Sequence, residues 1–162
     1  MTNNKAVASM LLPLNFCMYV IVLAIAAWAT NKAILEGFFI AGPGFDLPPQ
    51  FSPISFPMGN AATGFFVVFS LIAGVFGVAS IIVGIHHWNR DTDHMPCAAT
   101  SAAAIAWTLT ALAMGFAWKE IELQNRNANL RTMEAFLIIL TVTQLLYIAA
   151  ICRGSAAAAR FT

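Results

Sequence analysis

Four long runs without charged side chains organise the chain. Asp, Glu, Lys and Arg are all absent from Ala6–Asn31, Leu47–Asn89, His94–Trp118 and Ala135–Cys152. A membrane-spanning helix needs about 20 mainly apolar residues, so this pattern predicts an all-α membrane protein. We place four transmembrane helices of one integral membrane domain at residues 7–30, 61–86, 97–118 and 131–152.

The connections between these spans predict an up-down bundle with one unusual segment. The second and third connections are short, which makes the helices on either side of each antiparallel neighbours. The first connection, residues 32–58, holds five of the seven prolines and is rich in Phe, Leu and Ile. Such a proline density is incompatible with a regular helix, and a free linker would be more polar. We therefore expect an ordered Pro-rich flap over the bundle mouth, or alternatively an interfacial tether that only joins two helices.

The composition supports this assignment and excludes other classes. The 162 residues are 60% hydrophobic and 9% charged, against about 25% charged in an ordinary soluble domain. A soluble chain of this length could not bury so much apolar surface. The net charge of +1 gives no electrostatic footprint for nucleic acid, so we expect the lipid bilayer as the main partner.

The charge distribution leaves the orientation open. Four spans place both termini on one side, and four basic residues then fall on each side of the membrane: Lys5, Arg90, Arg153 and Arg160 against Lys32, Lys119, Arg126 and Arg131. The positive-inside rule therefore does not decide. We expect cytosolic termini, because a long structured flap is more often the exoplasmic element.

Small residues recur on one face of the second span. Ser70, Gly74, Gly77 and Gly84 follow one another at steps that place them on the same side of a helix. Small residues let helices approach closely in lipid. This face therefore predicts tight packing inside the bundle, with a homo-oligomer contact as the alternative.

Polar side chains inside the first and fourth spans are the candidate ligand site. Asn15 and Tyr19 are four residues apart, and Gln144 and Tyr147 are three apart, so each pair shares a helix face. These residues line a ligand path or serve as hydrogen-bonding contacts between helices. No charged residue is expected in the middle of a span, which argues against a proton pump, a voltage sensor or an anion clamp.

The remaining polar groups indicate structural roles. Lys119, Glu120 and Glu134 lie near one membrane face beside the third connection, and we expect an ion pair, for example Lys119–Glu134, that closes this hairpin, or alternatively a gate or binding rim. The segment His86–Cys97 contains His, Asp and Cys side chains, but their spacing matches no strong zinc signature. We expect no metal, no cofactor and no enzymatic activity, since no nucleophile–base pair or phosphate-binding loop is present.

Five stretches together carry a family resemblance: Phe56–Phe66, Leu71–Val75, Ala113–Ile121, Arg131–Phe136 and Thr143–Tyr147. With them the chain resembles the plant AWPM-like family, the plasma-membrane polypeptides induced by abscisic acid. The resemblance extends over residues 7–152.

The resemblance implies a four-span plasma-membrane protein of plants that accumulates in seeds and under drought and cold. At least one member of that family is proposed to bring abscisic acid into cells. Because no Lys or Arg that would accompany an anion is expected in the middle of a span, we expect any abscisic acid carried here to cross in its neutral form. The alternatives are a non-transporting protein that stabilises the membrane, or an accessory subunit of a membrane complex.

Overall fold

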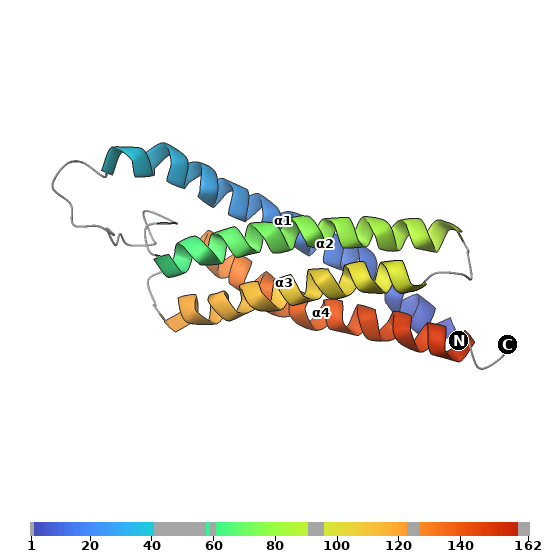
Figure 1. Ribbon diagram of the computed structural model, residues 1–162. Coiled ribbons are helices and arrows are strands. Elements are labelled where there is room, and N and C mark those ends of the chain that lie inside the picture. The colour runs from blue at the N-terminus through green and yellow to red at the C-terminus, as the bar shows by residue number, and fades with distance from the viewer. Residues whose placement is uncertain (1, 41–57, 59–60, 91–95, 123–126, 159–162) are drawn as a thin grey trace.

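The computed structural model describes residues 2–40, 58, 61–90, 96–122 and 127–158, and it consists of four long helices (Figure 1). They are α1 (Thr2–Ile40), α2 (Ala61–Arg90), α3 (Pro96–Glu122) and α4 (Ala128–Ala158). Each contains a segment long and apolar enough to cross a membrane. The prediction of an all-α protein with four transmembrane helices is confirmed, and the described part of the chain contains no strand.

The helices form an up-down ring in which α1 packs on α2, α2 on α3, α3 on α4, and α4 on α1. Figure 1 shows both chain termini at the same end of the bundle. We call this the terminal end, where α1 and α3 begin and α2 and α4 finish. The opposite end, where α1 and α3 finish, is the distal end.

The first helix is longer than the sequence predicted. Its end was expected at Thr30, with the flap starting at residue 32, but α1 continues to Ile40. The reason is that the prolines of the flap begin only at Pro43, so no proline interrupts helical hydrogen bonding between Thr30 and Ile40. The rest of the predicted flap, residues 41–57, lies outside the described residues.

The fourth helix begins earlier than predicted because a side chain caps it. The side-chain oxygen Oδ1 of Asn127 accepts a hydrogen bond from the backbone N–H of Asn129 at 3.3 Å. This is the usual way in which an N-cap residue satisfies a backbone donor of the first turn. The cap starts α4 at Ala128, before the predicted position 131.

Although further residues such as Met18 and Glu134 are also buried, one set of buried positions recurs at alternating steps of three and four residues in each of the four helices. In α1 and α3 they are Ala8, Leu12, Asn15, Tyr19, Val22, Ala26 and Ala29, and Ala99, Ala103, Ala106, Thr110, Ala113, Ala117 and Glu120. In α2 and α4 they are Thr63, Phe66, Ser70, Ala73, Gly77, Ser80 and Gly84, and Leu130, Met133, Leu137, Leu140, Gln144 and Tyr147. This repeat is the seam of a left-handed helical bundle.

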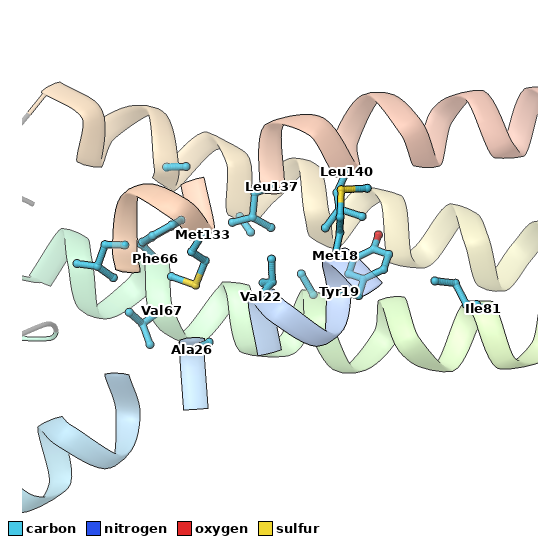
Figure 2. Close-up of a cluster of buried hydrophobic side chains, with 14 of the residues drawn as sticks. Met18, Tyr19, Val22, Ala26, Phe66, Val67, Ile81, Met133, Leu137 and Leu140 are labelled. Carbon is cyan, nitrogen blue, oxygen red and sulfur yellow. The ribbon is translucent and has the colours of Figure 1, made fainter. Parts of the chain in front are cut away.

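The four helices contribute side chains of different size to the core. Figure 2 shows Met18 and Val22 of α1 beside Leu137 and Leu140 of α4. Most of the buried residues of α3 are alanines, which allow its neighbours to approach closely. Next to this core, Phe69 of α2 stacks on a ring of α3, with ring centroids 5.0 Å apart.

The outer surface is suited to lipid. Large apolar side chains are exposed on every helix, among them Val20, Phe76, Leu112 and Leu146. At the distal end Trp118 is 68% exposed, and the Lys32 ammonium lies 5.7 Å from the centre of the Trp28 ring. Tryptophan with a nearby cation is typical of the membrane–water interface.

The small-residue face of α2 is turned toward α1 and α4. A Cβ added to Gly77 would overlap the ring of Tyr19. A Cβ at Gly74 would lie 3.2 Å from Leu23, and one at Gly84 would overlap the Tyr147 hydroxyl. Gly74 and Gly77 therefore lie where side chains of α1 pack directly on α2, and Gly84 lies beside the Tyr147 side chain of α4.

We expect Gly77→Ala to lower the free energy of unfolding by about 1–3 kcal/mol, because the added methyl group displaces the Tyr19 ring. Gly115→Ala is the matched control, since a Cβ there meets nothing within 4 Å. The control should be neutral or stabilising by up to about 1 kcal/mol, as alanine favours a helix over glycine. Thermal unfolding in detergent micelles measures the stability of both variants. Equal midpoint temperatures would contradict the close contact between Gly77 and the Tyr19 ring.

Candidate functional site

Two amide side chains meet inside the bundle between α1 and α4. The Nδ2 group of Asn15 donates a hydrogen bond to Oε1 of Gln144 at 2.9 Å. Asn15 is 1% exposed and Gln144 is 0% exposed, and both lie well within their candidate spans. The structure thus brings together two of the four residues predicted for a ligand path.

Each amide of this pair keeps one unused polar group. Within the part of the chain that the structure describes, neither Oδ1 of Asn15 nor Nε2 of Gln144 has a hydrogen-bond partner. Leaving such groups unpaired in an apolar environment costs about 1–3 kcal/mol each. The pair therefore presents one acceptor and one donor, both buried, to any molecule that reaches it.

Tyr19 lies one turn further toward the distal end and makes a different contact. Its hydroxyl lies 2.9 Å from Oγ1 of Thr110 on α3. Thr110 donates its own hydroxyl hydrogen to the carbonyl oxygen of Ala106 at 2.7 Å. Tyr19 is therefore the donor, and its bond joins α1 to α3 across the middle of the bundle.

Tyr147, the fourth predicted residue, lies one turn from Gln144 toward the terminal end. Its side chain is buried, and its hydroxyl lies beside Gly84 on α2. It makes no hydrogen bond to another described residue. The structure therefore orders the four residues along the bundle but does not bond either tyrosine to the amide pair.

The distal end contains a buried carboxylate whose contact with α2 was not predicted. Glu120 of α3 is 0% exposed, and the Thr63 hydroxyl of α2 lies 2.9 Å and 3.0 Å from its two carboxylate oxygens. This contact joins α2 to α3. Glu134 of α4 is also buried at this end.

The predicted ion pair between Lys119 and Glu134 is corrected by the structure. The Lys119 ammonium lies 2.7 Å from the Glu122 carboxylate, and the two side chains are 65% and 55% exposed. Lys119 lies on the outer face of α3, three residues from Glu122, whereas Glu134 lies on the buried face of α4. The hairpin is therefore not closed by this pair, and an exposed pair of this kind contributes at most about 1 kcal/mol.

A further contact joins α3 to α4. The indole Nε1 of Trp107 donates a hydrogen bond to the backbone carbonyl oxygen of Thr141 at 3.0 Å. With this bond included, side-chain hydrogen bonds connect α1 with α3 and α4, and α3 with α2 and α4. Hydrogen bonds of this type are the usual partners of polar side chains in a membrane bundle.

Comparison with known proteins places this arrangement in a family. The AWPM-19-like family matches residues 13–154, which include all of these interhelical polar contacts. The chain belongs to the AWPM-19-like family. It is 40% identical over 156 residues to a rice (Oryza sativa subsp. japonica) protein named membrane protein PM19L, an alignment that covers 93% of this chain and 80% of the relative. No solved structure matches the chain.

In this AWPM-19-like bundle, the residues of the polar contacts that the sequence did not predict share one property. Thr63, Thr110 and Glu120 all occupy the repeat of buried positions. On α3 that repeat is marked by alanines at 99, 103, 106, 113 and 117. Continuing the alanine pattern would have indicated that Thr110 and Glu120 face the interior.

We expect Thr63→Val to lower the free energy of unfolding by about 1–3 kcal/mol, because at nearly constant volume it removes a hydrogen bond to the buried Glu120 carboxyl group. The matched control is Thr132→Val, since the exposed Thr132 hydroxyl donates only within its own helix, to the carbonyl oxygen of Ala128. Denaturation in detergent micelles, followed by circular dichroism, compares the two. A loss of similar size in both variants would show that the Thr63–Glu120 contact adds no stability.

Proposed function

We propose that this AWPM-19-like protein facilitates entry of a neutral weak acid through the bundle, and that the acid is abscisic acid in its protonated form. The observation that carries the proposal is the buried pair of Asn15 and Gln144, with one unpaired acceptor and one unpaired donor. We further propose a plasma-membrane protein of plants that accumulates in seeds and under drought and cold, as the family resemblance implies.

The chemistry of a carboxylic acid supports this choice. A protonated carboxyl group carries one O–H donor and a carbonyl acceptor, whereas a carboxylate carries acceptors only. The O–H of the neutral acid complements Oδ1 of Asn15, and its carbonyl complements the N–H of Gln144 Nε2. The ionised acid would meet the Asn15 oxygen with a second acceptor, which is unfavourable in an apolar interior.

The charge pattern along the spans supports the same protonation state. The segments that surround the amide pair on α1 and α4, Ala6–Asn31 and Ala135–Cys152, contain no Lys or Arg. Carrying an anion across the apolar region would require a nearby cation, because an unpaired charge there is expensive. A neutral acid needs no such residue.

We expect protein-dependent uptake of abscisic acid into proteoliposomes to follow the neutral fraction of the ligand. That fraction falls about tenfold for each pH unit above the carboxyl pKa, so uptake should be far faster at about pH 5 than at about pH 7. Protein-free liposomes measure passive entry, which is subtracted. Protein-dependent uptake that is equally fast at both pH values would exclude this mechanism.

The amide pair is tested by substitution. We expect Gln144→Leu to reduce protein-dependent uptake about tenfold, because one strong hydrogen bond to the acid is worth about 1.4 kcal/mol. The control Thr143→Val should retain uptake, since that hydroxyl donates only to backbone oxygens of its own helix. The double variant Asn15→Leu/Gln144→Leu removes both amides, so it leaves no buried amide unpaired and should assemble without transporting.

A structural protein is the second candidate, and a specific observation favours it. Asn15 with Gln144, Tyr19 with Thr110, and Thr63 with Glu120 connect separate helices through buried hydrogen bonds. Such contacts also suit a bundle that stabilises the membrane and moves no solute. The same measurements separate the candidates: a wild-type protein that adds no uptake above that of protein-free liposomes, together with loss of assembly in Gln144→Leu, favours the structural role.

We propose that the termini face the cytosol, because a long segment between two spans is more often exoplasmic. Cys152 is exposed at the end of the fourth span. With Cys17 and Cys97 replaced by Ala, a membrane-impermeant maleimide should label Cys152 only after the cells are permeabilised. Thr132→Cys, in a background that also lacks Cys152, should be labelled on intact cells, because Thr132 is exposed near the opposite end of α4. The reverse pattern would place the termini outside.

A further inference from the structure

A small open pocket lies at the terminal end between α1 and α2. It has a volume of about 190 Å³ and is lined by Ser9, Leu12 and Pro13 of α1 and by Ile85 of α2. Neither Asn15 nor Gln144 lines it. Binding at this pocket is therefore independent of the proposed function.

Pro13 changes the chemistry of this pocket. Proline has no N–H, so the carbonyl oxygen of Ser9, four residues earlier in the helix, lacks its usual intrahelical donor. A helical carbonyl points along the axis toward the residue four positions ahead, and both Ser9 and Pro13 line the pocket. The pocket lining between Ser9 and Pro13 therefore contains a hydrogen-bond acceptor, the carbonyl oxygen of Ser9, that has no partner within the helix.

The Ser9 side chain adds a second acceptor and no donor. Its hydroxyl hydrogen is already donated to the carbonyl oxygen of Ala6, at a distance of 2.8 Å. Only the lone pairs of Oγ remain for another molecule. The other three lining residues, Leu12, Pro13 and Ile85, have apolar side chains. A ligand of this pocket must donate a hydrogen bond and must otherwise be apolar and uncharged.

The position of the pocket fits a molecule that lies in the membrane. Ser9 and Ile85 lie within one turn of the ends of the spans Ala6–Leu35 and Ala61–His86, at the depth of the membrane–water interface. One turn deeper along the two helices, Phe16 and Ile82 are apolar and exposed. The apolar body of a ligand can extend along this surface toward the bilayer centre.

We infer that this pocket binds a sterol, an uncharged membrane lipid whose single hydroxyl donates to the carbonyl oxygen of Ser9. A phosphatidylcholine head group carries no hydrogen-bond donor, and a fatty-acid carboxylate would bring a charge that none of the described lining residues balances. A sterol combines one donor at interfacial depth with a rigid apolar body, which is the combination that the lining residues require.

The test uses a photoreactive sterol in nanodiscs that contain the full chain. We expect cross-links to α1 around Ser9–Pro13 and to α2 around Ile82–Ile85. Unlabelled sterol should compete about tenfold better than its 3-O-methyl ether, which cannot donate, a ratio that corresponds to about 1.4 kcal/mol for one hydrogen bond. Equal competition by the ether, or by diacylglycerol, would overturn the assignment to a sterol hydroxyl.

Two substitutions and a control decide the role of the pocket. Pro13→Ala restores a backbone N–H that can bond the Ser9 carbonyl within the helix, and it should reduce labelling about tenfold while keeping α1 intact. Ile85→Trp fills the pocket and should reduce labelling independently of the carbonyl. Met10→Ala changes an exposed residue on the same turn of α1 that does not line the pocket, so labelling should be retained. Full labelling of both Pro13→Ala and Ile85→Trp would show that the sterol binds elsewhere.

Discussion

The contact between Tyr19 and Gly77 determines how the other helices can meet. Helices in lipid gain little from the hydrophobic effect when they associate, so close packing and hydrogen bonds must hold them together. The absence of a side chain at Gly77 lets the Tyr19 ring lie directly against α2. From that position its hydroxyl reaches Thr110 on α3. One tyrosine of α1 thus fixes the distances to two other helices, and it sets the rotation of α1 that turns Asn15 toward Gln144 on α4.

The same polar groups are suited both to assembly and to recognition. Asn15 and Gln144 use one hydrogen bond to join α1 and α4, and each retains a group that the described part of the bundle does not satisfy. A polar pair at a buried position of a helical repeat commonly specifies which helices pair and in which register. Because each amide also keeps one polar group without a hydrogen bond to another described residue, the pair provides a place where a small polar solute can be stabilised. The interhelical contact and the proposed acid site are therefore two consequences of one pair of amides.

The sequence was sufficient for the features that depend on composition and local spacing. Charge-free runs define the four spans because lipid excludes charge wherever in the bundle a helix lies. The end of α1 was predicted too early because the apolar segment before Pro43 was interpreted as part of the proline-rich connection. The contacts Thr63–Glu120 and Tyr19–Thr110 were missed, and Lys119 was given the wrong partner, because the direction of each side chain depends on how a helix is rotated against its neighbours. That rotation becomes visible only when the repeat of buried positions is followed along the whole helix.

The excess length of α1 has a mechanical consequence. Its candidate span has 30 residues, whereas the others have 25 or 26; at 1.5 Å per residue it is longer by about 6 Å. The last buried side chain of α1 among the described residues is Ala29, and Figure 1 shows its far end diverging from the other three helices. A span that exceeds the thickness of the hydrocarbon layer is accommodated by tilting. When the bilayer thickens or thins, the part of α1 that follows Ala29 can therefore change its tilt. The buried residues of α1 up to Ala29 keep their contacts with the neighbouring helices.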